Sequence, residues 1–366
     1  MSEPNKLPLI SICLPVYNGG KHLAAALESI LAQTFNDYEL LIADDGSTDG
    51  SIELAESFAK RDGRIRFWKN SQRQGLFGNY NACIKEAKGK YIKTFAQDDV
   101  LMPDALACMK EVLEKEPTVA LVSSSRQILD DDGNVSELKQ PIKQNLQAPG
   151  KEVICFHLIS LNNWVGEPST VMFRREHAGT GFDAAYYHYG DIEYWFRILI
   201  NGDFYYFERP LSCFRRHAAS QTDKNHRELF FALDILRLCT TYRHMLADIE
   251  SVDLFKRRVA EKISLEHGHV LDAASEDIFE AYQKAFITAD GSSLLSSDAA
   301  GFRLLASLSL STISELIKEL DHEKRCRAVE QERFAAEVEK MQNSIYYKLA
   351  SPLRKVKDAI KGNSAE

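Results

Sequence analysis

Apolar runs rich in β-branched and aromatic residues alternate with amphipathic segments over the first third of the chain. The runs predict strands at residues 10–16, 38–44, 64–69, 90–96 and 118–124. The segments between them carry apolar residues at helical spacing and predict helices at 21–33, 49–61, 77–88 and 103–115. Strands that alternate with helices of this length predict an α/β fold, with a mostly parallel sheet flanked by helices.

The pattern changes twice further along the chain. From residue 126 to 225, proline, glycine, histidine and aromatic residues are mixed, which is typical of a site-bearing region, and residues 130–134 predict a hairpin turn. After residue 226 almost every segment has helical periodicity. We therefore expect an α/β domain over residues 1–225, a helical region over 226–312 and a charged helical tail over 313–366.

Composition and charge narrow the class of protein. The chain has 366 residues, 45% of them hydrophobic and 27% charged, as in an ordinary globular protein. A net charge of −8 argues against nucleic acid as a partner. The cysteines are scattered, the N-terminus lacks a signal-peptide pattern, and the most apolar helical stretch, 302–313, is too short to span a bilayer. We expect a soluble cytoplasmic protein, at most peripheral on the cytoplasmic face of a membrane.

Two pairs of adjacent carboxylates, Asp44–Asp45 and Asp98–Asp99, stand where predicted strands end. A third predicted strand ends at Pro15-Val16-Tyr17-Asn18. Like charges repel one another, and partly buried carboxylates are costly unless a cation or hydrogen-bond donors satisfy them. Because the carboxyl ends of parallel strands meet at one edge of a sheet, this pattern predicts a ligand crevice that contains a metal ion.

The first 220 or so residues resemble an inverting glycosyltransferase of family two, with the GT-A fold of the nucleotide-diphospho-sugar transferase superfamily. The motifs that carry the resemblance occur in the family's order: Pro15 to Asn18, Ser29 to Thr34, Asp44 to Asp49, Gln97-Asp98-Asp99, Gly190-Asp191 with Trp195 and Arg197, and Arg215-Arg216-His217. The resemblance implies transfer of a sugar from a nucleoside-diphosphate sugar, of UDP or dTDP type, to a hydroxyl of a glycan or lipid-linked acceptor. It implies a role in surface polysaccharide or glycoconjugate synthesis.

Candidate donor-binding residues follow from this resemblance. Pro15, Tyr17 and Asn18 are candidates for binding the nucleotide sugar, and the Tyr17 ring offers a face on which a base can stack. The resemblance assigns Asp45 to the pyrimidine, and its carboxylate matches the ring N–H that uracil and thymine carry and neutral cytosine lacks. The alternative is that Asp44 or Asp45 caps the following helix, as Ser47, Thr48 or Asp49 also can. Arg73 is either a phosphate ligand or a solvated arginine.

The second carboxylate pair occupies the position of the family's metal motif. The resemblance implies that Asp98 reaches the ribose and that Asp99 binds Mg²⁺ or Mn²⁺, cations that suit an all-oxygen site with substrate phosphates. The alternative is an N-cap before the helix that begins near Pro103. His217 either completes the metal site, with Arg215 and Arg216 on the phosphates, or is a surface histidine.

Asp191 stands where the family has its catalytic base, the carboxylate that takes the proton of the acceptor hydroxyl. Glu193 is the fallback, and a simple helix-terminal charge is the alternative for Asp191. Members of the family usually carry Glu-Asp here, whereas this chain has Gly190-Asp191. The resemblance also places residues 167–170 at the acceptor pocket.

Rival classes lack their own motifs. A nucleotidyltransferase would need a glycine-rich basic loop after the first strand, a dehydrogenase a G-x-G-x-x-G there, and a processive synthase spanning helices. A catalytically inactive glycosyltransferase-like binding or scaffold protein is the remaining alternative.

In the tail, an apolar stripe at helical spacing is flanked by basic residues, and it fits either a membrane surface or self-association through the C-terminal helices. The stripe consists of Ile345, Leu349, Leu353, Val356 and Ile360.

Overall fold

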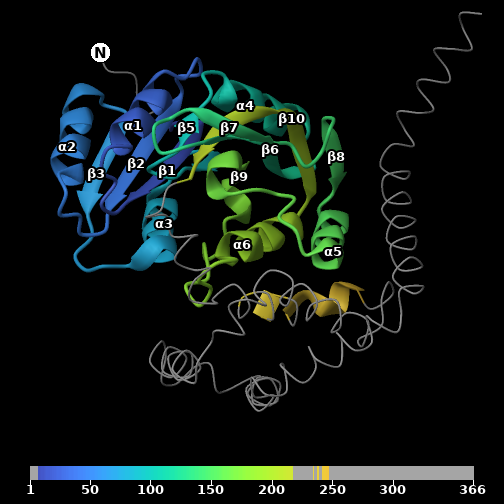
Figure 1. Ribbon diagram of the computed structural model, residues 1–366. Coiled ribbons are helices and arrows are strands. Elements are labelled where there is room, and N and C mark those ends of the chain that lie inside the picture. The colour runs from blue at the N-terminus through green and yellow to red at the C-terminus, as the bar shows by residue number, and fades with distance from the viewer. Residues whose placement is uncertain (1–6, 217–233, 235–236, 239–240, 247–366) are drawn as a thin grey trace, which may run out of the picture. The chain divides into compact units, whose positions relative to one another are not determined.

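The computed structural model describes residues 7–216, Asp234, residues 237–238 and residues 241–246 (Figure 1). Nearly all of the helical region expected over 226–312, and the whole tail expected over 313–366, lie outside the described residues. The two boundaries between the three expected domains therefore stay predictions. No helix in the described part of the chain is long and apolar enough to cross a membrane.

The N-terminal half of the fold is the predicted parallel α/β unit. Its strands lie side by side in the order β3-β2-β1-β4, and all are parallel to one another. They are β1 (Ile10–Val16), β2 (Tyr38–Asp44), β3 (Ile65–Lys69) and β4 (Tyr91–Thr94). β1, β2 and β4 are buried on both faces, which explains their continuous apolar runs, whereas the edge strand β3 is mostly half-buried.

The sheet continues through strands that the sequence pattern predicts only in part. β9 (Met172–Arg174) pairs antiparallel with both β4 and β6 (Val119–Leu129), and β6 pairs parallel with β10 (Asp203–Arg215). The predicted hairpin at 130–134 is confirmed, because β7 (Val135–Lys139) turns back along β6. The short strands β5 (Val100–Leu101) and β8 (Leu146–Pro149) pair with β10. All ten described strands thus form one sheet.

Helices cover both faces of this sheet, and the four predicted ones are present (Figure 1). α1 and α4 pack on the face that carries Ile12 and Leu14, whereas α3 packs on the opposite face, where Cys83 lies against the Leu41 carbonyl at 3.6 Å. The described α-helices are α1 (Leu23–Leu31), α2 (Ser51–Arg61), α3 (Gly75–Glu86), α4 (Ala105–Lys115), α5 (Gly150–Ser160) and α6 (Gly190–Leu199). Short 3-10 helices occur at Pro168–Thr170, Arg175–His177 and Arg243–Leu246.

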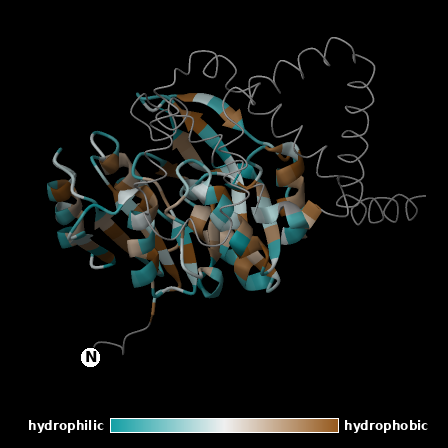
Figure 2. Ribbon diagram, turned by 90° about the horizontal axis from the view of Figure 1, so that it is seen from below, coloured by the Kyte–Doolittle hydropathy of each residue, from teal (hydrophilic) through white to brown (hydrophobic). Residues whose placement is uncertain are grey.

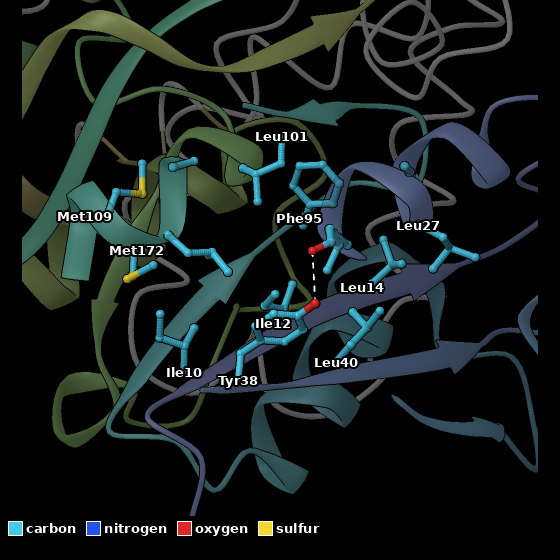
Figure 3. Packing of buried hydrophobic residues seen from close by; sticks show 14 of the residues in the cluster. Ile10, Ile12, Leu14, Leu27, Tyr38, Leu40, Phe95, Leu101, Met109 and Met172 are labelled. Carbon is cyan, nitrogen blue, oxygen red and sulfur yellow. Dashed lines mark hydrogen bonds between the residues drawn. The ribbon is translucent and has the colours of Figure 1, made fainter. Parts of the chain in front are cut away.

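The largest apolar cluster lies between the sheet and the α1–α4 layer. Figure 3 shows Ile12, Leu14 and Leu40 of the strands in one cluster with Leu27 of α1 and Met109 of α4. The helices carry both hydrophobic and hydrophilic residues (Figure 2), as expected for amphipathic helices that turn one face to a sheet. This rigid layer fixes the ends of β1, β2 and β4, from which the candidate site is built.

Candidate active site

The direction of the strands brings the predicted site residues to one edge of the sheet. β1, β2, β4, β6 and β10 are parallel, so their carboxyl ends share that edge. β9 runs the opposite way, so the segment that precedes it, residues 167–170, lies at the same edge. This edge carries Tyr17 after β1, Asp45 after β2, Asp98 and Asp99 after β4, and Arg215 at the end of β10. Such an edge is the usual ligand crevice of a parallel α/β sheet.

The loop after β1 is fastened to the loops after β2 and β4. The Tyr17 amide donates to Gln97 Oε1 (2.9 Å), and Gln97 Nε2 donates back to the Tyr17 carbonyl (3.0 Å). The Asn18 amide donates to Ser47 Oγ (2.9 Å), while Asn18 Oδ1 accepts from the Thr48 amide (2.8 Å). Pro15 is buried within β1. Three sequence motifs therefore form one hydrogen-bonded unit.

Tyr17 presents an open ring, and Arg73 lies on it. The side chain of Tyr17 is 38% exposed, and the guanidinium carbon of Arg73 is 4.0 Å from its ring centroid. A cation over an aromatic face is attracted by the ring quadrupole. Arg73 is thus placed beside the nucleotide-binding candidates, in a cation–π contact.

Asp45 holds the start of α3. Its Oδ1 accepts from the Gln74 amide (2.7 Å) and Asn70 Nδ2 (3.0 Å), and its Oδ2 accepts from the Gly75 amide (2.8 Å). The carboxylate is 3% exposed. The alternative that Asp44 or Asp45 caps the next helix, α2, is wrong, because Asp49 Oδ1 accepts from the amide of Ser51, where α2 begins (3.1 Å).

Asp44 serves the turn that follows β2. Its Oδ2 accepts from the amides of Gly46 (2.9 Å) and Ser47 (3.0 Å), which closes the turn that presents Asp45. Its Oδ1 is buried and has no hydrogen-bond partner among the described residues. The first aspartate of the pair is therefore a backbone-shaping residue.

Asp99 is a buried carboxylate with one open oxygen. Its Oδ1 accepts from the Arg215 amide (2.8 Å), whereas Oδ2 has no hydrogen-bond partner in the part of the chain that the structure describes. Burial, and then the neighbouring charge of Asp98, raise the pKa of Asp99 well above its usual value. The helix-cap alternative is wrong, because α4 begins at Ala105 after Asp104.

Arg215 is a structural brace, and His217 lies just outside the described residues. The Arg215 side chain is 5% exposed; its Nε donates to the Asp98 carbonyl and its Nη1 to the Asp130 carbonyl, both at 2.9 Å. These bonds fix the loop of Asp98 and Asp99 to the β6–β7 turn and leave Arg215 little freedom to bind phosphate.

Asp191 occupies the first turn of α6. Its Oδ1 accepts from the Ile192 amide (2.8 Å). Burial, with smaller contributions from the charges of Glu167 and Asp234, raises the pKa of Asp191 to about 7. This value suits a group that must accept a proton near neutral pH.

The departure from the family's Glu-Asp pair has a steric cause. A Cβ at Gly190 would lie 2.3 Å from Cε2 of Phe77, a residue of α3. Phe77 stacks on Phe182 with ring centroids 5.2 Å apart. The aromatic ring therefore occupies the space that any side chain at position 190 would need.

Glu193, the fallback base, is occupied by an ion pair. It is 6% exposed, and Arg197 Nε lies 2.8 Å from Oε1 and 3.0 Å from Oε2. The Tyr242 hydroxyl also donates to Oε1 (3.0 Å). Both oxygens are bound, so the geometry favours Asp191 over Glu193.

The segment expected at the acceptor pocket is fixed to the end of β4. Thr94 Oγ1 donates to the Pro168 carbonyl (2.8 Å), and the Ala96 amide donates to Ser169 Oγ (2.9 Å). Buried Lys93 donates to the Ser169 carbonyl (2.5 Å), and burial lowers the pKa of this lysine to about 7. These hydrogen bonds between the end of β4 and residues 168–169 were not predicted from the sequence, because Lys93 stands there as one residue within an apolar run.

Glu167 links the two halves of the site electrostatically. It forms an ion pair with the buried Arg126, whose Nε lies 2.5 Å from Oε2. The charge of Glu167 raises the pKa of both Asp99 and Asp191. The metal candidate and the base candidate therefore lie within interaction range of the same carboxylate.

Asp234 is a site residue that the sequence analysis missed. It is 2% exposed and accepts hydrogen bonds from the amides of Tyr187 (2.8 Å), His188 and Tyr189 (2.9 Å), immediately before α6. One signal was available: Asp234 is a lone acid within the apolar stretch 230–236. A buried carboxylate needs donors, so this pattern predicts a partner.

One hollow of about 720 Å³ lies elsewhere, along β3. It is lined by residues of α2, β3 and α3, among them Phe67 and Trp68. It contains none of the candidate site residues and does not belong to the site.

The sheet order, the helices on both faces and the acidic edge define a GT-A-type α/β protein. The sequence model described as "Glycosyl transferase family 2" matches residues 11–182. An uncharacterized protein of Mycobacterium tuberculosis is 30% identical over 242 residues, which are 64% of this chain and 75% of that protein. The chain belongs to glycosyltransferase family 2.

Named relatives match over shorter stretches. Glycosyltransferase GlyG of Streptococcus pneumoniae is 32% identical over 126 residues, 34% of this chain and 42% of the relative. Hyaluronan synthase of Pasteurella multocida is 36% identical over 135 residues, 37% of this chain and 14% of the relative. The matched part thus spans less than half of either named protein.

Solved structures share the fold. The S. aureus TarS 1–349 structure in complex with UDP has a TM-score of 0.52 and 15% identity, over 71% of this chain and 72% of that one. At this identity the likeness shows the fold alone. Asp191 and Asp234 both lie beyond the residues matched by the family model.

Proposed function

We propose that this protein is an inverting, metal-dependent glycosyltransferase. It moves a sugar from a UDP- or dTDP-type donor to a hydroxyl of a glycan or lipid-linked acceptor, in surface polysaccharide or glycoconjugate synthesis. The observation that carries the proposal is the meeting of Tyr17, Asp45 and Asp99 at the carboxyl ends of parallel strands, with residues 167–170 hydrogen-bonded to the end of β4, because donor and acceptor chemistry must meet within one site. Family membership, the synthase names among the relatives and the UDP-bound TarS structure support it.

On this proposal, the donor nucleoside lies against the loops after β1 and β2. The base stacks on Tyr17 beside Asn18, and Asp45 receives its ring N–H on Oδ2, which has one protein donor. Asp98 reaches the ribose. Arg73 leaves the Tyr17 ring for the diphosphate, because a charge-assisted bond to phosphate is stronger than an exposed cation–π contact.

The open Oδ2 of Asp99 fits a divalent cation. It is a buried carboxylate oxygen without a donor in the described part of the chain, and such an atom is costly unless a cation or donor satisfies it. Asp99, with His217 as a further candidate ligand, would hold Mg²⁺ or Mn²⁺. When bound, the ion supplies Lewis-acid stabilisation of the charge on the departing diphosphate.

Asp191 is the proposed base. Its carboxylate takes the proton of the acceptor hydroxyl as that oxygen attacks the anomeric carbon. The nucleoside diphosphate leaves from the opposite face, so the configuration of the sugar inverts. The pKa of about 7 lets Asp191 hold the proton and then release it near neutral pH.

A thermal-shift and turnover experiment on the full chain tests the proposal. UDP, dTDP and their sugars should raise the melting temperature with Mn²⁺, because a ligand that binds only the native state stabilises it. CDP is the matched control. Nucleotide release from the sugar donors should disappear in EDTA and return with Mn²⁺. Binding without any release would favour the inactive binding or scaffold protein instead.

A further inference from the structure

Described residues between 234 and 242 contact residues 185–189, which lead into α6. The described residues Asp234, Arg237, Leu238, Thr241 and Tyr242 have the three- and four-residue spacing of one helix face. Asp234 accepts from the amides of Tyr187, His188 and Tyr189. Arg237 Nη1 donates to the Ala185 carbonyl (2.6 Å).

The same face also reaches α6 itself. The Tyr242 hydroxyl donates to Glu193 (3.0 Å), and the Tyr242 ring meets Phe196 edge-on at 5.1 Å. The Arg237 guanidinium lies 5.0 Å from the centroid of the Tyr186 ring. Contacts from this face therefore extend from residue 185 to residue 196, on both sides of Asp191.

The three amides on one carboxylate make the central contact strong. A charged acceptor forms shorter and stronger hydrogen bonds than a neutral one. Its negative charge also complements the positive N-terminal end of α6. Because the donors are consecutive residues, one carboxylate fixes the backbone directly before Gly190 and Asp191.

We propose that Asp234 is a positioning residue, which holds residues 187–189 so that the Asp191 carboxylate points at the acceptor hydroxyl. The inference rests on the proposed role of Asp191 as the base. It extends the site to a segment beyond residue 225, outside the stretch that resembles the family.

Asp234 acts on Asp191 through charge as well as geometry. Its negative charge adds to burial and to the charge of Glu167 in raising the pKa of Asp191. On α6, Glu193 is paired with Arg197, and Arg237 lies near Asp234. Burial raises the pKa of Asp234 itself to about 6, against the opposing effect of its three amide bonds. Asp234 is therefore mostly charged above pH 7, where Asp191 is deprotonated.

Hydrogen exchange of the full chain tests the contact of Asp234 with the amides of residues 187–189 without any assay of activity. In Asp234→Asn the amides of residues 187–189 should exchange at least tenfold faster, because the charged acceptor is lost. The matched control is Asp183→Asn, which removes an exposed carboxylate of the same loop; in the described part of the chain this carboxylate accepts from one amide, that of Ala185 (2.9 Å). Unchanged exchange at 187–189 in Asp234→Asn would overturn the inference, whatever the protein's activity.

Kinetics then test the consequence for Asp191. Asp234→Asn should lower kcat about 10- to 100-fold through misplacement of the base, with the KM for the donor within about twofold. The acid limb of the kcat–pH profile of this variant should move to lower pH, because a charge that raises the pKa of Asp191 is gone. Asp234→Glu keeps that charge, so its limb should stay near the wild-type position even where the asparagine variant fails to fold.

The outcomes separate the two proposals. Faster exchange with an unmoved acid limb would reduce Asp234 to a purely structural residue and overturn the inference. If exchange at residues 187–189 is faster in Asp234→Asn than in the wild type, but the wild type releases no nucleotide from any donor, the proposed function is overturned instead.

Discussion

Three aspartates of the candidate site differ in what surrounds their oxygens. Asp45 is bound by two backbone amides and a side-chain amide, Asp99 keeps one oxygen without a donor in the described chain, and the half-buried Asp191 meets one amide. The same side chain is therefore suited to three tasks: holding a loop beside a base, meeting a cation and accepting a proton. Local burial and donors decide between them.

Asp191→Asn keeps the shape of the side chain and removes the proton acceptor. Turnover should fall about 10²- to 10⁴-fold, with UDP affinity by calorimetry nearly unchanged. In the wild type kcat should rise with pH through about 7, because Asp191 is protonated below its pKa and cannot accept the hydroxyl proton. Near-normal turnover of Asp191→Asn would remove Asp191 from this role. So would a wild-type kcat that does not change between about pH 5.5 and about pH 8, a range that brackets the pKa.

Asp45→Asn should weaken the binding of UDP and remove the preference for UDP over CDP. A hydrogen bond to a charged acceptor contributes about 1.5–3 kcal/mol, so the wild type should prefer UDP by about tenfold or more. Calorimetry with both nucleotides measures this ratio. Equal affinities of the wild type for UDP and CDP would contradict the assignment of the base to Asp45.

At the scale of elements, regular pattern decides what the sequence can predict. The β1–β4 unit and α1–α4 follow from apolar runs and helical spacing, since β1, β2 and β4 are buried on both faces. β9 has three residues, and β10 contains Pro210 with register shifts on both sides, so neither shows a strand pattern along the chain. Their places come from pairing with β4 and β6, which only the folded chain provides.

The contact between α3 and α6 gives a stability prediction. Gly190→Ala should lower the free energy of unfolding by about 1–3 kcal/mol, because its Cβ would overlap the Phe77 ring. Chemical denaturation measures the change, and Phe77→Leu in the same chain should recover part of it. Gly63→Ala is the control, since nothing lies within 4 Å of a Cβ there. Equal stability of the two alanine variants would show that Phe77 does not require glycine at position 190.

At the scale of the whole molecule, the site is assembled from distant segments. The loops of Tyr17, Asp45 and Asp99 were predictable, because acids and an aromatic residue follow apolar runs in the sequence. The Arg126–Glu167 ion pair and the Asp234 contacts were not, because a single residue in an irregular or helical stretch does not reveal a partner far along the chain. Long-range pairing is the part that one sequence leaves open.

The tail carries a further prediction at this scale, outside the described residues. We propose that the apolar stripe Ile345 to Ile360, with its basic flanks, binds the cytoplasmic face of a membrane. The full chain should pellet with anionic vesicles at low salt, because each basic residue near the surface adds about 1 kcal/mol. A chain that ends at Met341 is the control and should stay in solution. If both stay in solution, self-association is the better reading of the stripe.

The most direct test of the central claim is the anomeric configuration of the released sugar. The full chain is incubated with UDP- and dTDP-sugars and Mn²⁺, and the first-formed anomer is followed by NMR, with water or an added glycan as acceptor. We expect Mn²⁺-dependent cleavage with inverted configuration, which Asp191→Asn abolishes. Retained configuration, cleavage that persists in Asp191→Asn, or no cleavage of any donor that the protein binds would contradict it.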